Sequence, residues 1–486
     1  MGTSRYLVVS DLHLCDIEDL EEGWKDYKKS RGLFDAELDA MLAHFEADGA
    51  PGDALTLVLN GDIFDFDLVT AIPDEPSWSV GPIERTSGLV PNAPKSVWKL
   101  ERILADHPGF LATVARFAAA GHKVVFVIGN HDTELWFPAV QDALRAAVAA
   151  AAPDGARLPP DAVTIETWFY YVPGQIYVEH GHQYDYYSSY RYVLDPTYEQ
   201  GGERLLALPT GNLSNRYILS NIGTFNPHAT DYILSLFGYL RHWWNHYVRR
   251  GRSLGLTWLV GSLRTLFALL NIRAREPRQA PEGYDGRLED CAAHHGLTPH
   301  VVKALHGLHH EPITSRIFKI IREFWLDRVA LATLMTLATV VLAFAPVHLA
   351  VKIVVPFLSF PLIWFVYQWL AGNDNALNLE YKSHAYAYAI ASHLRDVRLV
   401  VFGHTHVPNL IPVSRGVTFA NTGTWAPIWE KGSHAPAAGL RNYVHAVFRG
   451  GGEPSIELGS WVDHRDAPSP TRAGRWRSSA ATRARG

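Results

Sequence analysis

The first part of the chain alternates between short apolar runs and segments whose apolar residues recur at helical spacing. Strand-like runs lie at 5–11, 54–62, 123–130 and 175–182. Segments with helical spacing lie between them, at 34–46, near 97–119 and near 138–152. Strands that alternate with helices in this way are typical of an α/β fold, in which helices cover the faces of a sheet.

The alternation stops after residue 182 and returns near the end of the chain. Residues 183–396 are rich in aromatic residues and arginine, and they predict a large helical insertion. Strand-like runs then return at 397–406, 416–425, 442–450 and 454–461. We therefore predict one α/β domain in two parts, 1–182 and 397–465. The last residues, 466–486, are rich in Ser, Pro and Arg and predict a disordered basic tail.

Polar residues follow the predicted strands at the points where the strands end. They are Asp11, His13, Asp62, Asn130, His131, Asp132, His180, His182, His404 and His406. One such residue alone is more often a turn or cap residue than a ligand, but strand ends converge on one edge of an α/β sheet. Carboxylate, amide and imidazole groups suit divalent Mn, Fe or Zn. The set is too large for one ion, whereas two ions about 3.5–4 Å apart would use it and would suit displacement at phosphorus.

Five short blocks in these regions resemble a known family. In chain order they read SDLHL, NGDIFD, GNHD, EHGHQYD and GHTHVP. Their order and their positions after strands resemble the calcineurin-like metallophosphoesterase superfamily, over about 1–182 and 397–465. The resemblance implies a four-layer α/β/β/α sandwich, hydrolysis of phosphoric esters, and two divalent metal ions, with Mn²⁺ preferred over Fe or Zn.

The resemblance also implies which residues bind the two ions. One ion would be bound by Asp11, His13 and His406, and the other by Asn130, His180 and His404. Asp62 would bridge the two ions. These assignments place both histidines of the GHTHVP block at the metal centre, because side chains two positions apart on extended backbone share a face.

The same resemblance implies that His131 takes part in the chemical step. His131 would donate a proton to the leaving oxygen or stabilise charge in the transition state, with Asp132 orienting its ring. Asp65 would support a metal ligand, and His182 would face the substrate or a ligand. Within the superfamily the chain is distantly similar to UDP-2,3-diacylglucosamine hydrolases, which carry Arg where this chain has His131.

The insertion contains two long apolar runs. Residues 329–345 include no charged side chain, and 349–371 include only Lys352. Each run is near the length that crosses a hydrocarbon core of about 30 Å, so we predict a transmembrane hairpin. A hairpin returns the chain to the side it left, which would place the catalytic domain on the cytoplasmic face of the cytoplasmic membrane. The alternative is a buried helical pair in a soluble domain.

Two other segments of the insertion have distinctive compositions. Residues 239–278 mix arginines with tryptophans and leucines, which favours an amphipathic helix on an anionic lipid surface. The alternative is an arginine stripe over ordinary helix packing. The segment 293–312 is rich in histidine, but Thr298 before Pro299 predicts a helix cap, so we expect its histidines to be surface or packing residues.

Composition and charge narrow the choice of function. The net charge of −5 gives no general attraction to nucleic acid. Cys15 and Cys291 are too few for a disulfide framework. We therefore expect a membrane-associated phosphoesterase whose partners are the lipid bilayer and a phosphorylated, lipid-linked ester or pyrophosphate. The alternatives are a soluble nucleotide or phosphoprotein substrate, or a metal-binding membrane scaffold without turnover.

Overall fold

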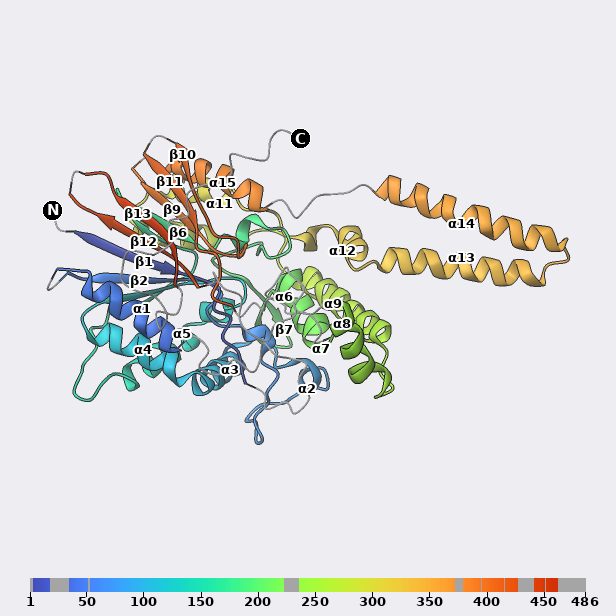
Figure 1. Cartoon of the computed structure of the whole chain (residues 1–486), viewed down its shortest axis with the longest axis horizontal. Helices are drawn as coiled ribbons and strands as arrows, with labels where there is room; N and C mark the ends of the chain where they lie inside the picture. The colour runs from blue at the N-terminus through green and yellow to red at the C-terminus, as the bar shows by residue number, and fades with distance from the viewer. Residues whose placement is uncertain are drawn as a thin grey trace.

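The computed structural model describes residues 3–17, 35–50, 53–222, 236–371, 379–394, 396–414, 416–426, 441–450 and 452–461. The predicted basic tail, 466–486, lies outside the described residues. Figure 1 shows a body of sheets and helices from which one pair of long helices extends.

Two sheets form the centre of the body. The first contains β1 (Ser4–Val9), β2 (Leu55–Asn60), β3 (Lys123–Val127), β4 (Val163–Glu166), β12 (Asn442–Phe448) and β13 (Ser455–Ser460). The second contains β5 (Phe169–Val172), β6 (Ile176–Glu179), β9 (Leu399–Phe402), β10 (Asn409–Ser414) and β11 (Val417–Asn421). Their strand orders are β13-β12-β1-β2-β3-β4 and β10-β11-β9-β6-β5.

Strands from both sides of the insertion join in each sheet. β1 pairs in parallel with β2 and antiparallel with β12. β9 pairs in parallel with β6, with Val401 opposite Val178. Because β1, β2 and β3 run in parallel, the residues that follow them meet at one edge of the sheet.

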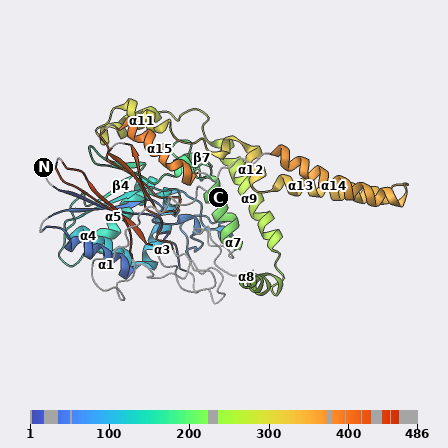
Figure 2. The ribbon, with the colours of Figure 1, turned by 45° about the horizontal axis from the view of Figure 1, so that its top comes forward.

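Helices cover both outer faces of the paired sheets (Figures 1 and 2). The first sheet is covered by α1 (Asp35–Ala47), α3 (Ala93–Asp106), α4 (Pro108–Ala119) and α5 (Pro138–Ala150), and the second by α10 (Tyr284–His294), α11 (Pro299–His306) and α15 (Leu379–His393). Val8, Val58 and Val401 belong to the apolar core that the two sheets share. The predicted four-layer α/β/β/α sandwich is confirmed.

The outer helical layer of the second sheet comes from the middle of the chain. Leu288, Leu305 and Ile390 pack in one apolar cluster with Val400 and Phe402 of β9. Residues 183–396 therefore supply α10, α11 and α15 to the sandwich in addition to the elements that extend from it.

One predicted helix, near 97–119, is two helices in the structure. α3 ends at Asp106, and α4 begins at Pro108, with His107 between them in a non-helical conformation. A proline inside a helix lacks an N–H and clashes with the preceding turn, but it fits the first turn of a new helix. The sequence signal for the break was Pro108, and the prediction of one continuous helix was wrong.

The other elements lie in loops of the sandwich and in the insertion. The loops hold η2 (Phe66–Leu68), α2 (Glu84–Ser87), η3 (Thr133–Trp136) and η4 (His182–Tyr184). The insertion holds β7 (Thr197–Gln200), β8 (Glu203–Leu206), α6 (Thr210–Ser214), η5 (Asn215–Leu219), α7 (Ser220–Ile222), α8 (Leu236–Trp243), η6 (Trp244–Val248), α9 (Leu254–Arg275), η7 (Ile313–Ser315), α12 (Ile317–Glu323), α13 (Leu326–Phe344) and α14 (Leu349–Ala371).

Three helices in the described part of the chain are long and apolar enough to cross a membrane, namely α9, α13 and α14. α9 lies along the body, where Leu269 and Ile272 are buried in the apolar core and Phe267 is 65% exposed. α13 and α14 extend away from the body side by side (Figures 1 and 2), and their apolar windows are only 6% and 0% buried. The alternative of a buried helical pair is therefore wrong.

Candidate metal centre

The predicted ligands lie just after the parallel strands of both sheets. Asp11 and His13 follow β1, Asp62 follows β2, Asn130 follows β3, His180 follows β6, and His404 and His406 follow β9. The structure brings these side chains into neighbouring groups of ligand atoms, each group within 4.8 Å: Asp11, His13 and His406 form one, and Asp62, His180 and His404 form another.

The backbone at most of these positions is left-handed. The φ angles of Asp11, His13, Asp62, His404 and His406 are 57°, 51°, 53°, 66° and 59°. Non-glycine residues seldom adopt this conformation, which costs roughly 1–3 kcal/mol each and is concentrated at functional sites. The bends turn the chain sharply at the ends of β1, β2 and β9, so that their side chains face a common centre.

The first group is held by Asp11. Its Oδ1 lies 3.0 Å from Nε2 of His406 and 3.9 Å from Nε2 of His13, and the two imidazole nitrogens are 3.3 Å apart. Burial opposes the charge on Asp11, but the nearby rings of His406 and His180 outweigh that effect and lower the pKa of its carboxyl. One oxygen of an ionised carboxylate and two imidazole nitrogens thus converge on one point.

The second group is centred on Asp62. Its Oδ2 lies 3.1 Å from Nε2 of His180, and its Oδ1 accepts a hydrogen bond of 2.8 Å from the backbone N–H of His131. Burial opposes the charge on Asp62, but His180 and His131 hold the pKa of its carboxyl well below its usual range. Asp62 also lies within 4.8 Å of His13, so its carboxylate stands between the two groups.

Gly129 is required where β3 approaches Asp62. A Cβ at this position would lie 2.3 Å from Oδ1 of Asp62, which is far inside van der Waals contact. Only glycine lets the chain that carries Asn130 pass so close to the carboxylate.

In several of the candidate histidine ligands, one of the two ring nitrogens faces a carbonyl or carboxylate oxygen of the protein. Nδ1 of His180 donates to the backbone carbonyl of Asn60 over 2.8 Å, which leaves Nε2 for the centre. Nδ1 of His13 faces Oδ2 of Asp65 at 3.4 Å, and Nε2 of His404 faces Oδ2 of Asp185 at 3.2 Å. Such partners fix the tautomer and orientation of a metal-binding imidazole.

His131 sits between two carboxylates and an amide. Its Nδ1 is 3.5 Å from Asp65 and 3.4 Å from Asp67, and its Nε2 is 3.4 Å from the side-chain amide of Asn215. Burial disfavours the charged ring, but Asp65 and Asp62 outweigh it and raise the pKa of His131 well above its usual value. The ring is held beside the metal centre, and its raised pKa favours the protonated form.

Asp132 has a different place from the one predicted. Its two oxygens accept hydrogen bonds from the backbone N–H groups of Gly129, over 2.6 Å, and Ile63, over 2.8 Å. Asp132 therefore joins the loops after β2 and β3, and the carboxylates that face the His131 ring are Asp65 and Asp67.

Sequence reasoning missed four residues of this region. Asn212 donates to the backbone carbonyl of Asn130 over 2.7 Å and also to Asp67. Asn215 follows one helical turn later and reaches His131, while Asp185 reaches His404. The signals were the third aspartate of NGDIFDFD, which is Asp67, and the last residue of EHGHQYD, which is Asp185. Two asparagines three positions apart were the third signal, because this spacing puts side chains on one helical face.

A comparison with known protein families matches residues 4–254, more than half of the 486 residues, to the calcineurin-like phosphoesterases. The chain belongs to the calcineurin-like phosphoesterase family. The match includes Asp11, Asp62, Asn130 and His180, and it confirms the predicted superfamily. A search of the curated proteins finds no match.

Membership makes the protein a metal-dependent hydrolase of phosphoric esters, and the family implies a dinuclear site for divalent ions. The residues of this phosphoesterase fit two cations. Oδ1 of Asn130 and Nδ1 of His404 are buried and have no hydrogen-bond partner among the described residues, and each offers a lone pair that a cation would satisfy. The nitrogen and oxygen ligands, without thiolate, suit a divalent ion of moderate hardness.

Proposed function

We propose that this phosphoesterase works at the surface of a membrane and hydrolyses a phosphate ester or pyrophosphate of a lipid-linked substrate. The observation that carries the proposal is the hairpin of α13 and α14, two apolar helices that extend from the body with their side chains exposed. Phe344, Phe357 and Trp369 are 87%, 76% and 74% exposed. Exposed apolar surface of this extent is costly in water and is typical of segments that lie in lipid.

The polar residues of the hairpin support its insertion into a bilayer. Arg328 and Asp327 lie at the base, next to the body, where Arg328 donates to Gln368 of α14. Lys352, near the far end, donates from Nζ to the backbone carbonyl of Ala343 over 2.6 Å. Charged groups at the two ends and apolar residues between them match a helix pair that spans from one interface toward the other.

The base of the hairpin connects to the metal centre through packed side chains. Glu323 of α12, which precedes α13, accepts a hydrogen bond of 3.3 Å from the hydroxyl of Tyr186. The next residue back along the chain, Asp185, faces His404 at 3.2 Å. A substrate whose headgroup reaches the metal centre would therefore have its lipid part near the membrane surface.

The roles of the side chains follow from the geometry. The two divalent ions, for which we propose Mn²⁺ with Fe or Zn as alternatives, would supply positive charge and a water molecule of lowered pKa beside the phosphoryl group. Asp11, His13 and His406 would hold one ion, and Asn130, His180 and His404 the other, with Asp62 shared. His131 would give its proton to the leaving oxygen, while Asp65 and Asp67 stabilise the charged ring.

The hairpin returns the chain to the side it left, so the strands on either side of it can pair. Both parts of the sandwich would then lie on one side of the membrane, and we propose that this side is the cytoplasmic face of the cytoplasmic membrane. The second candidate is a soluble substrate, such as a nucleotide, with the hairpin serving only to attach the enzyme. The counter-observation is the hydrogen bond from Tyr186 to Glu323 of α12, the helix before the hairpin, because attachment alone does not require it.

Replacement of residues 329–371 by a short linker tests the proposal. The variant should leave the membrane fraction and lose activity on phosphorylated lipids in mixed micelles. It should still cleave a small aryl phosphoester at the wild-type rate, because the metal centre lies in the body. Equal activity of both forms on the best natural substrate would contradict the lipid-linked substrate, and a variant that stays with liposomes in flotation would contradict attachment through the hairpin.

A further inference from the structure

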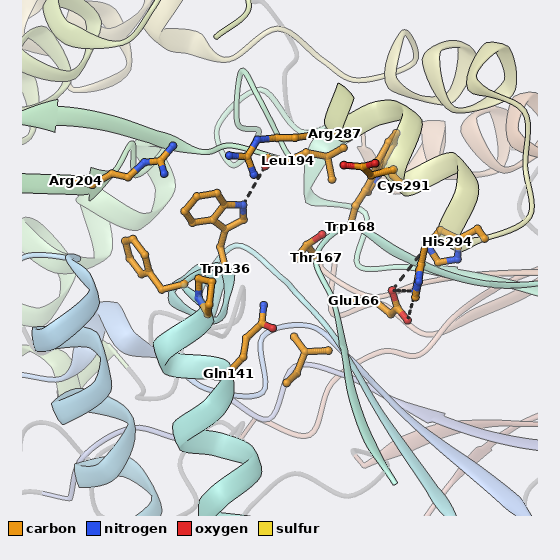
Figure 3. A pocket seen from close by; sticks show the side chains of 15 residues that line it. Trp136, Gln141, Glu166, Thr167, Trp168, Leu194, Arg204, Arg287, Cys291 and His294 are labelled. Carbon is orange, nitrogen blue, oxygen red and sulfur yellow. Dashed lines mark hydrogen bonds and ion pairs between the residues drawn. The ribbon is translucent and has the colours of Figure 1, made fainter. Parts of the chain in front are cut away.

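A cavity of about 580 Å³ lies between the edge of the first sheet and helix α10, away from the metal centre (Figure 3). Its wall includes Trp136, Trp168 and Glu166 from the sandwich, and Cys291, His294 and His295 from α10 and its end. Glu166 is the last residue of strand β4, so this cavity joins the edge of the sheet to the middle segment of the chain.

Glu166 and His294 point toward one another in one corner of the cavity (Figure 3), and His295 belongs to the same group of possible ligands. Nε2 of His294 is 3.2 Å from Oε2 of Glu166, and Nε2 of His295 is 3.8 Å from the same oxygen. The three ligand atoms all lie within 4.8 Å of one another. No residue of this cluster belongs to the dinuclear site.

These separations match those of a zinc ion's ligands. Ligand atoms about 2.0–2.2 Å from Zn²⁺ in tetrahedral geometry lie about 3.3 Å from one another. The distance between Glu166 and His294 agrees with that value, and the distance between Glu166 and His295 is slightly longer. A separation of 3.8 Å is too long for a hydrogen bond but short enough for two ligands of one ion.

The ring of His295 is held in place beside the Glu166 carboxylate. His295 stacks on Phe169 with ring centroids 4.4 Å apart, which fixes the orientation of its ring. The packed ring therefore keeps its Nε2 within 3.8 Å of Oε2 of Glu166.

We propose that Glu166, His294 and His295 form a third metal site, which binds a divalent ion of the zinc type. A fourth ligand position then faces the cavity. The two arginines of the cavity wall, Arg204 and Arg287, lie 2.9 Å and 3.5 Å from Asp195 and share that one carboxylate.

The bound ion would fasten α10 to the sheet. β4 lies at the edge of the first sheet, and α10 belongs to the layer that covers the second sheet. An ion shared by Glu166 and the two histidines would therefore link α10 to the edge of the first sheet, next to the short connection between β4 and β5. Its effect would be on stability and would be independent of catalysis.

Zinc stoichiometry of the untagged full-length protein tests the site. The first variant is His294→Ala, because this side chain is 63% exposed and its removal leaves the core intact. Glu166→Gln is the second, since it keeps the shape of the side chain. The matched control is His300→Ala on α11, an exposed histidine outside the cavity. Metal content is measured by mass spectrometry after dialysis against buffered Zn²⁺.

The wild type and His300→Ala should bind the same amount of zinc, and His294→Ala and Glu166→Gln should each bind one ion fewer per chain. Loss of one ligand should weaken binding at least about tenfold, since even changes behind the ligands cost about 10–100-fold. Because the readout is a difference between variants, it does not depend on the content or activity of the dinuclear site. Equal zinc in the wild type, His294→Ala and Glu166→Gln would overturn the proposal, as would an equal loss in His300→Ala.

A second readout uses thermal unfolding. Zn²⁺ should raise the melting temperature of Asp62→Ala protein, whose dinuclear site is disabled, and should fail to raise that of the Asp62→Ala, His294→Ala double variant. An identical rise in both proteins would place the stabilising ion elsewhere and would contradict the site.

Discussion

Asn212 donates a hydrogen bond from its side-chain amide to the backbone carbonyl of Asn130 over 2.7 Å. Asn212 belongs to α6, in the segment that interrupts the two parts of the sandwich. Asn130 follows β3 and is a candidate metal ligand whose Oδ1 has no hydrogen-bond partner among the described residues. A residue of the insertion thus positions a candidate ligand. The same amide group also reaches Asp67, one of the carboxylates that face His131.

Asn212→Ala should lower kcat about 10–100-fold and weaken the binding of one of the two metal ions, because it removes a group that orients a ligand. Steady-state kinetics and metal analysis check both effects. The matched control is Asn221→Ala, which removes a similar hydrogen bond to the carbonyl of Tyr217 within the same region. If the two variants behave alike, Asn212 contributes only to local packing.

Replacement of Asp62 tests the shared carboxylate. Asp62→Ala should abolish activity and lower the content of both metal ions, because one side chain lies between the two ligand groups. Asp74→Ala, which removes an exposed carboxylate, should leave both ions in place. Two tightly bound ions in the Asp62→Ala protein would show that the bridging role is assigned to the wrong residue.

The role of His131 is open to a test with substrates of different leaving groups. His131→Ala should retain both metal ions and lose about 10²–10⁴-fold in rate, the usual contribution of a positioned acid. The loss should shrink for aryl esters whose leaving groups need no proton. The same loss for good and poor leaving groups would point to charge stabilisation, and His384→Ala on the exposed face of α15 serves as the control.

Replacement of Asp67 gives a second test of the proton-donating role of His131. Asp67→Asn keeps the side-chain shape but removes a negative charge 3.4 Å from Nδ1 of His131. The rate should fall in the same leaving-group-dependent way as for His131→Ala, though by less, because Asp65 remains. The metal content should not change. A loss of metal would mean that Asp67 positions the metal ligands and does not act only through His131.

The stability of the protein should fall in mild acid through a histidine far from the metal centre. Burial lowers the pKa of His445 on β12 to about 4, and its ring packs 4.5 Å from that of Phe45. Between the usual pKa near 6.5 and the folded value near 4, the unfolded chain binds the proton and the folded protein does not. The free energy of unfolding therefore rises with pH across this window, by at most about 1.4 kcal/mol per unit.

His445→Gln should flatten this dependence, since glutamine does not titrate. Chemical unfolding at pH 5 and pH 8 gives the two free energies whose difference is compared between the proteins. The prediction concerns that difference and not the absolute stability, which the substitution also changes. An unchanged difference would assign the acid sensitivity to other groups.

The sandwich and the groups of candidate ligands could be predicted because both depend on local patterns. Each ligand follows an apolar strand, and parallel strands bring their ends together whatever connects them. The partners of His131 and Asn130 could not be found in this way. Asn212 and Asn215 lie about 80 positions from the residues they contact, and nothing in a polar helix indicates which surface it will face.

Two other features show the same limit. The position of the Asp132 carboxylate depends on the loop after β2, because it accepts a hydrogen bond from the backbone N–H of Ile63 in that loop. His294 is largely exposed and His295 stacks on Phe169, as expected of surface or packing residues, but their contact with Glu166, more than 120 positions away, could not be predicted. Contacts between distant segments, and not the segments themselves, were the missing information.

The pairing of β6 with β9 also sets an order of events during synthesis. β6 ends at Glu179 and β9 begins at Leu399, so a ribosome completes the whole hairpin before it delivers His404 and His406. Closing a loop of this length costs little more free energy than closing a shorter one, but strand pairs of high sequence separation form slowly. A nascent chain would thus be inert until its apolar helices have left the ribosome, and catalytic competence would arise last.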